Sequence, residues 1–160
     1  MVEGRLIGIA RHDRPRGEME TLDHAEVTTA LGVVGDFRGA AKPGSKRKRQ
    51  VTVMAAADWL AAVRELGVPL EWQVRRVNLL VEGLALPRVT GTLLRFAGGV
   101  VLEVTGECDP CSRMDTIAPG LKAVLTPDWR GGITTRVIAD GPIALGDRVE
   151  IEWHDQLQDA

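Results

Sequence analysis

The chain has 160 residues and a formal net charge of −2 at pH 7, and 44% of its residues are hydrophobic. A chain of this length builds one substantial core and is too short for two, so we expect a single domain over residues 1–160. Because the net charge is close to zero, no electrostatic argument favours a nucleic acid or a membrane as partner.

No segment of the sequence has the features of a membrane span or an export signal. No apolar run approaches the roughly 20 residues that cross a bilayer. Residues 1–5 lack the basic start and apolar core of a signal peptide. The two cysteines stand three positions apart, which does not suit a framework of structural disulfides. We therefore expect a cytoplasmic protein in a reducing compartment.

The first part of the chain predicts short strands and one long loop. Apolar segments at residues 5–10, 26–29 and 51–54 are typical of strands. Residues 35–50 contain three glycines, a proline and the basic run 46–49, and they predict an exposed loop. The ordinary interpretation of such a basic run is a solvated surface. Long loops in compact domains are often functional, however, and we expect this one to close over an anionic ligand.

Residues 58–66 carry the clearest helical pattern in the sequence. Trp59, Leu60, Val63 and Leu66 are expected on one buried face. A glycine and a proline directly after this segment supply the helix stop.

The second half of the chain predicts mostly strands. These are expected at residues 78–82, 92–96, 100–105, 133–139 and 148–153. The segments 92–96 and 100–105 form a hairpin across a Gly-Gly turn. Short helices are expected at 109–116 and 120–125. About seven strands with one good helix predict a mixed α/β, mainly β fold: a closed or nearly closed β-barrel with a few short helices.

Cys111 is the strongest candidate for chemistry. It follows the predicted strand 100–105 and stands two residues before Arg113, near an expected helix start. Positive charge and helix N-terminal amides favour the thiolate, which is both the nucleophile and the metal ligand. The plain alternative is a buried free cysteine with a packing role.

The Cys108–Cys111 spacing also matches other kinds of site. A thioredoxin-like redox pair belongs at the head of a helix in a βαβ unit, which the sequence does not predict here. A zinc site needs two further ligands at suitable spacing, and the three histidines are far away and unclustered. Cys108 is interpreted as a packing residue or a resolving thiol.

The run Arg130-Gly131-Gly132 has two interpretations. It suits an ordinary hairpin turn with a surface arginine. It also suits an anion site, because glycines let backbone amides approach an anion and arginine offers a forked donor for phosphate. If the strands beside them are adjacent and antiparallel, Arg130 and Cys111 line one cavity.

Arg75 and Arg76 directly precede a predicted strand. If their side chains alternate, one arginine points inward and needs a buried partner. Asp36 and Glu82 are the candidates for that partner.

The order and spacing of these segments resemble the MOSC family, named for the C-terminal domain of molybdenum cofactor sulfurases. The resemblance spans roughly residues 4–153 and centres on Cys111 after Pro110. The matching segments are Leu31-Gly32-Val33-Val34-Gly35-Asp36, Arg75-Arg76-Val77-Asn78, Val81-Glu82-Gly83-Leu84, Pro110-Cys111, Pro119-Gly120-Leu121, Arg130-Gly131-Gly132 and Gly146-Asp147-Arg148-Val149. The family fold is a mixed β-barrel, in agreement with the pattern of strands.

The resemblance implies molybdenum cofactor (molybdopterin) chemistry with Cys111 at its centre. In the sulfurases the domain follows a pyridoxal phosphate desulfurase, receives sulfur and binds the cofactor. Related proteins use the matching cysteine as molybdenum ligand and reduce N-hydroxylated compounds. The residues assigned to cofactor binding on this basis are Asp36, Arg75, Arg76, Asn78, Arg130, Gly131 and Gly132.

Three functions remain open from the sequence. Cys111 could carry sulfane sulfur as a persulfide, taking it from a cysteine desulfurase or another sulfur donor and passing it to a molybdoenzyme or metal–sulfur acceptor. It could instead be the molybdenum ligand of a reductase component that needs an electron-donor protein. The third function is a non-catalytic small-molecule binding module. Since the sequence predicts no desulfurase or electron-transfer domain, we expect any activity to need a partner.

Overall fold

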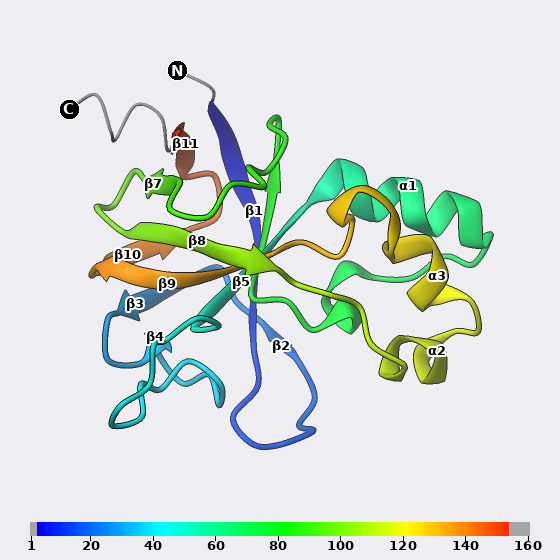
Figure 1. The fold of residues 1–160 in the computed structure, drawn as a ribbon, viewed down its shortest axis with the longest axis horizontal. Coiled ribbons are helices and arrows are strands. Elements are labelled where there is room, and N and C mark those ends of the chain that lie inside the picture. Colours follow the sequence, from blue (N-terminus) through cyan, green and yellow to red (C-terminus); the bar gives the residue numbers. More distant parts are fainter. Residues whose placement is uncertain (1–2, 154–160) are drawn as a thin grey trace.

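Seven strands close into a barrel in the structure, a computed structural model that describes residues 3–153 (Figure 1). Around the barrel the order is β1-β11-β7-β8-β9-β5-β6, and β6 pairs again with β1. The strands are β1 (Glu3–Arg11), β2 (Glu20–Thr21), β3 (His24–Thr28), β4 (Gly32–Val33), β5 (Val51–Ala55), β6 (Leu79–Glu82), β7 (Leu93–Phe96), β8 (Val101–Glu107), β9 (Ile133–Ala139), β10 (Gly141–Ala144) and β11 (Arg148–Glu152). The expected closed barrel is confirmed.

Three short helices lie on one side of the barrel (Figure 1). They are α1 (Ala56–Leu66), α2 (Arg113–Ile117) and α3 (Leu121–Leu125), and two 3₁₀ turns cover Trp72–Arg75 and Pro127–Trp129. The strands β5 and β6 run parallel, so the chain needs a crossover between them. The helix α1 and the first 3₁₀ turn supply it.

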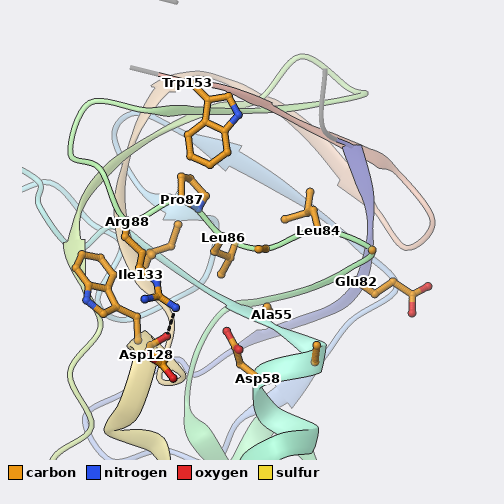
Figure 2. A pocket seen from close by; sticks show the side chains of 14 residues that line it. Ala55, Asp58, Glu82, Leu84, Leu86, Pro87, Arg88, Asp128, Ile133 and Trp153 are labelled. Carbon is orange, nitrogen blue, oxygen red and sulfur yellow. Dashed lines mark hydrogen bonds between the residues drawn. The ribbon is translucent and has the colours of Figure 1, made fainter. Parts of the chain in front are cut away.

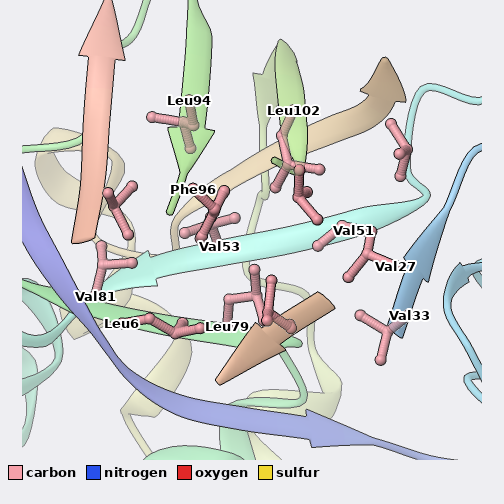
Figure 3. Close-up of a cluster of buried hydrophobic side chains, with 14 of the residues drawn as sticks. Leu6, Val27, Val33, Val51, Val53, Leu79, Val81, Leu94, Phe96 and Leu102 are labelled. Carbon is pink, nitrogen blue, oxygen red and sulfur yellow. The ribbon is translucent and has the colours of Figure 1, made fainter. Parts of the chain in front are cut away.

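Two apolar clusters stabilise this arrangement. The larger fills the barrel with side chains from the strands, among them Leu6, Val53 and Leu102 (Figure 3). The second packs outside the barrel, between Met54 on β5 and helix residues such as Trp59. Because β5 lies between the two clusters, all five of its residues are buried. Both ends of β5 therefore have fixed positions.

The helix α1 differs in one detail from the predicted pattern. Trp59 is buried as expected, but Leu60 is 53% exposed and Ala62 is buried in its place. The helical spacing explains the error: the two buried residues, Trp59 and Ala62, stand three residues apart on one face, whereas Leu60 is rotated by about 100° from Trp59.

The strand β10 was not predicted, because its Gly141-Pro142 start is typical of a turn. It pairs with β3, which also pairs with β4, in a small three-stranded sheet. The expected hairpin of β7 and β8 and the long loop before β5 are both confirmed, and residues 34–50 contain turns but no helix or strand. Within residues 3–153, no helix has the length and apolar character to span a membrane.

Candidate functional site

A narrow cleft brings together five of the predicted site residues. It lies where the end of β1, the loop 34–50, the starts of β5 and β6 and the segment after β8 meet. Its lining residues are His12, Asp36, Arg38, Arg49, Thr52, Arg75, Arg76, Asn78, Cys111, Arg113 and Met114. The cleft holds about 70 Å³ of free space.

Cys111 is an exposed free cysteine at this cleft, whereas Cys108 is a free cysteine with 1% exposure. As expected, a helix follows: α2 begins at Arg113. It has only five residues, and its Met114 amide already donates to the Cys111 carbonyl at 3.0 Å. The N-terminus of α2 therefore has few free amides near the Cys111 thiol. The positive charge of the cleft comes from its arginines.

Arg75 is the inward arginine that the sequence predicted, with 4% exposure. Its Nη2 atom donates to the carbonyls of Cys108 at 2.7 Å and Gly131 at 3.0 Å. The same atom lies 3.4 Å from the Cys108 sulfur. The buried partner is thus a pair of backbone carbonyls, and the expected pairing with Asp36 or Glu82 is wrong. Arg75 connects the end of β8 to the turn before β9.

Arg76 lies among several positive charges of the cleft. Burial lowers the pKa of Arg76 below its usual value, and the neighbouring Arg38 and Arg113 lower it further, while Asp36 opposes them. Five arginines and one aspartate line the cleft. Since guanidinium groups keep their charge at neutral pH, they repel one another, and an anion bound among them would relieve that repulsion.

His12 and Asp36 are a buried pair in the wall of the cleft. Asp36 accepts a hydrogen bond from the His12 backbone amide at 3.1 Å. The His12 Nδ1 atom lies 3.5 Å from the same carboxylate oxygen, but it is buried without a hydrogen bond. Burial lowers the pKa of His12, and Arg76 and Arg38 add to this effect, against the opposing Asp36 and Asp13. Burial therefore favours the neutral form of the His12 imidazole.

Asn78 holds three strands together beneath the cleft. Its Oδ1 atom accepts from the Thr52 amide at 3.1 Å and lies 3.2 Å from the Thr52 hydroxyl. Its Nδ2 atom donates to the Ala10 carbonyl at 3.1 Å. Asn78 is 5% exposed, so all these groups are shielded from water. Its position in the cleft wall is fixed by β1, β5 and β6.

Arg130 does not line the cleft, and the expected cavity shared with Cys111 is wrong. The strands are adjacent and antiparallel as predicted, since β8 pairs with β9. The Arg130 side chain turns the other way, where it pairs with Glu65 and donates to the Val124 carbonyl at 3.0 Å. It satisfies a carbonyl at the end of α3. The arginine that lines the cleft near this turn is Arg75, which donates to the Gly131 carbonyl.

The glycines after Arg130 serve close backbone contacts. A Cβ atom on Gly131 would lie 2.6 Å from the Cys108 carbonyl oxygen. The Gly132 amide donates to Trp129 at 3.0 Å, and its carbonyl accepts from the Cys108 amide at 2.9 Å. The Gly132 amide is thus already bound within the turn.

The basic run in the loop is partly directed inward. Arg47 donates to the Val137 carbonyl at 3.0 Å, and Arg49 lies 3.6 Å from the Cys108 sulfur. The carbonyl oxygens of Lys46 and Lys48 accept from side chains of β9 and β8. The loop is therefore attached to the barrel at this end, while Lys46, Lys48 and Arg49 remain exposed, as a solvated run predicts.

The sequence did not identify several cleft residues. Arg38 and Arg49 lie in an irregular loop, where no periodicity assigns a direction to a side chain. His12 was considered only as a zinc ligand, and it was set aside because it is far from the two cysteines in sequence. The one available signal was local: His12 stands two residues after the predicted strand 5–10, and it directly follows β1 in the structure.

Comparison with known proteins agrees with this geometry. The fold and cleft define a β-barrel protein with an exposed thiol beside clustered arginines. The family model of the MOSC domain matches residues 35–150. The chain belongs to the MOSC domain family, which is associated with molybdenum cofactor proteins.

Solved structures share the fold at low sequence identity. The YuaD protein of Bacillus subtilis superposes with a TM-score of 0.77 and 20% identity, over 95% of this chain and 97% of that one. YiiM from Escherichia coli gives a TM-score of 0.65 and 18% identity, over 92% of this chain and 69% of YiiM. YiiM from Geobacillus stearothermophilus gives 0.65 and 15%, over 95% and 74%. No curated protein matches the sequence.

Cys111 is expected to react with alkylating agents before Cys108. The Cys111 thiol is exposed, whereas Cys108 is buried and contacts Arg49 and Arg75, so Cys108 reacts only after local opening. Limited treatment with iodoacetamide at neutral pH, followed by peptide mapping, measures the order. Equal labelling of the two cysteines would contradict this assignment.

The stability of the protein is expected to fall below pH 6.5 because of His12. The folded state lowers its pKa from 6.5, so the unfolded state binds the proton more readily. This stabilisation is complete above pH 6.5 and is lost as the pH falls toward the folded pKa, by at most about 1.4 kcal/mol per pH unit. Urea unfolding should show a shallower dependence in His12→Gln. The exposed His24→Gln should behave like the wild type, and identical curves for all three proteins would refute the prediction.

Proposed function

We propose that this protein carries sulfane sulfur on Cys111 and delivers it to a metal–sulfur centre in molybdenum cofactor chemistry. One observation carries the proposal: the exposed Cys111 thiol stands at a cleft lined by five arginines and one aspartate. These guanidinium groups place positive charge around the space beside the Cys111 thiol. The same groups stabilise the anionic form of a persulfide.

Sulfur transfer onto Cys111 is a simple displacement. The Cys111 thiolate attacks the outer sulfur of a persulfide on a cysteine desulfurase or another sulfur donor. The S–S bond of the donor breaks, its inner sulfur leaves as a thiolate, and a new S–S bond forms on Cys111. The outer sulfur keeps its proton until the arginine-lined cleft favours its loss. A thiolate of the acceptor protein then attacks this outer sulfur, a new S–S bond forms on the acceptor, and the S–S bond on Cys111 breaks so that Cys111 leaves as a thiolate.

The cleft residues also suit a molybdopterin cofactor. Its phosphate would bind to Arg38, Arg49 and Arg76, because arginine offers forked donors to phosphate. Cys111 would be the soft thiolate ligand of molybdenum. Among residues 3–153 no three His, Cys, Asp or Glu side chains cluster as a metal site. When bound, the cofactor supplies redox chemistry at molybdenum, and the protein contributes charge and one thiolate.

Entry of a whole cofactor would require the loop 34–50 to move, with the contacts of its basic run to the barrel broken. Pockets for such ligands usually hold about 300–1,000 Å³, whereas this cleft holds about 70 Å³. Arg38 and Arg49 both come from the loop, so its opening would widen the cleft and its closure would return two positive charges to the ligand. Hydrogen exchange of residues 35–45 should slow when molybdopterin is added. Unchanged exchange despite binding would rule out closure.

Intact mass spectrometry tests the sulfur-carrier function directly. The protein is incubated with a cysteine desulfurase and cysteine, without added thiol. We expect one extra sulfur atom on the wild type and on Cys108→Ser, and none on Cys111→Ser. Extra sulfur on neither cysteine, or on Cys108 alone, would refute the proposal.

The alternative is a reductase component with Cys111 as molybdenum ligand, favoured by the same cluster of arginines. Elemental analysis of natively expressed protein separates the two functions. Stoichiometric molybdenum that is lost in Cys111→Ser supports the alternative. If neither molybdenum nor extra sulfur is found, a non-catalytic binding module is the remaining function.

A further inference from the structure

A second and larger cavity lies near the opposite ends of β5 and β6 (Figure 2). Its volume is about 760 Å³, within the range of small-molecule sites. Thr52 and Asn78, at the starts of these strands, line the Cys111 cleft, whereas Ala55 and Glu82, at their ends, line this pocket. The distance from Thr52 to Ala55 along β5 is about 10 Å. The pocket is therefore separate from the Cys111 cleft.

The walls of the pocket are mainly apolar and aromatic. Leu84, Leu86 and Pro87 come from the segment after β6, Trp129 comes from the turn before β9, and Trp153 follows β11. Figure 2 shows Trp153 and Leu86 around the same space. Such walls take up the hydrocarbon or aromatic part of a ligand, and indole faces also attract cations.

The charged groups of the pocket are mostly acidic. Asp58 and Asp128 contribute two carboxylates and Arg88 one guanidinium, while the carboxylate of the lining residue Glu82 points away from the pocket in Figure 2. Arg88 is held in place, because its Nη2 atom donates to the Asp128 carbonyl at 2.7 Å. This balance is opposite to that of the Cys111 cleft, where arginines dominate. The pocket thus favours a cation where the cleft favours an anion.

Asp58 is the carboxylate best placed to meet a ligand. It lies in the first turn of α1, where the positive end of the helix dipole favours its ionised form. In Figure 2 its carboxylate points toward the interior of the pocket. Burial nevertheless raises its pKa, with Asp128 adding to the effect and Arg88 and Arg130 opposing it. A bound cation would compensate for this loss of solvation.

We propose that this pocket binds a small apolar or aromatic molecule with a protonated amine, the amine pairing with Asp58 and the apolar part packing between Trp129, Leu86 and Trp153. This site goes beyond the sulfur-carrier function and does not depend on it. The Cys111→Ser variant should bind such a molecule as the wild type does.

Three probes of one shape but different charge test the proposal: 2-phenylethylamine, 2-phenylethanol and 3-phenylpropionate. Binding is followed by protein tryptophan fluorescence and by the indole N–H signals in ¹⁵N NMR spectra. We expect the amine to bind about tenfold more tightly than the alcohol, the effect of one charge-assisted hydrogen bond. The carboxylate should bind most weakly. The largest shifts are expected at the indoles of Trp129 and Trp153.

Two variants locate the site. Asp58→Asn should remove the preference for the amine and leave the affinity for the alcohol unchanged, whereas the exposed Asp13→Asn should keep the preference. Ala57→Trp fills the pocket from an exposed helix position and should abolish binding of all three probes while circular dichroism remains unchanged. The proposal is overturned by equal binding of the three probes, by preference for the carboxylate, or by an amine preference that survives Asp58→Asn. The absence of saturable binding at millimolar concentration also overturns it.

Discussion

Arg75→Ala is expected to lower the free energy of unfolding by about 3 kcal/mol. Arg75 is buried and donates to two carbonyls, of Cys108 and Gly131. The substitution leaves both carbonyls buried without these donors, at a cost of about 1–3 kcal/mol each. It also removes one link between the end of β8 and the turn before β9, which remain joined by the hydrogen bond from the Cys108 amide to the Gly132 carbonyl. Urea unfolding monitored by tryptophan fluorescence measures the loss.

Arg76→Ala is the matched control, because it removes the same charge one residue later. Within residues 3–153, Arg76 makes no side-chain hydrogen bond, and its role in the cleft is electrostatic. Its substitution should change stability by less than about 1 kcal/mol while weakening the binding of an anion such as molybdate or phosphate. If Arg76→Ala destabilises the protein as much as Arg75→Ala, the structural role assigned to Arg75 is incorrect.

Much of the fold could be predicted, because most barrel strands carry a local pattern. In β11, Val149 and Ile151 are buried as their alternation predicts, and the hairpin of β7 and β8 has a Gly-Gly turn. The strand β10 could not be predicted in this way, because it owes its extended form to pairing with β3. Its local sequence begins with Gly-Pro and favours a turn.

The candidate site was predicted less completely, for a physical reason. The sequence pointed to Cys111, Arg75, Arg76, Asn78 and Asp36, and the structure brings them to one cleft. Sequence patterns assign a face to side chains in helices and strands but not in turns. For that reason the direction of Arg130 was mistaken.

The hydrogen-bond partners of Arg75 also could not be predicted from the sequence. A buried arginine suggests a carboxylate by its charge, yet Arg75 binds backbone carbonyls of Cys108 and Gly131. Every residue type carries such a carbonyl, so no sequence pattern reveals it. The same holds for Arg49, whose side chain reaches the sulfur of Cys108 from an irregular loop.

Gly132→Ala is expected to destabilise the protein by about 3–5 kcal/mol, or to prevent folding. Gly132 has a φ of +104°, and a Cβ atom there would overlap the Val53 carbonyl oxygen and lie 3.3 Å from the Met54 Cα atom. Backbone strain of this kind costs about 1–3 kcal/mol, and overpacking against a rigid strand adds about 1–3 kcal/mol. Because β5 is buried between both apolar clusters, it cannot move away.

Gly99→Ala separates these two causes. Gly99 has almost the same φ, +102°, but no atom lies within 4 Å of the position of its Cβ. Its substitution should therefore cost only the strain, about 1–3 kcal/mol. Thermal and urea unfolding measure the loss of stability in each variant. The difference between the two losses is the contribution of the contact between the turn 130–132 and β5. Equal losses would mean that the contact is not tight, and that Gly132 is needed for its backbone angle alone. A larger loss of stability for Gly132→Ala would show that this glycine is needed for close packing against β5. The binding of anions is then a property of the arginines of the cleft.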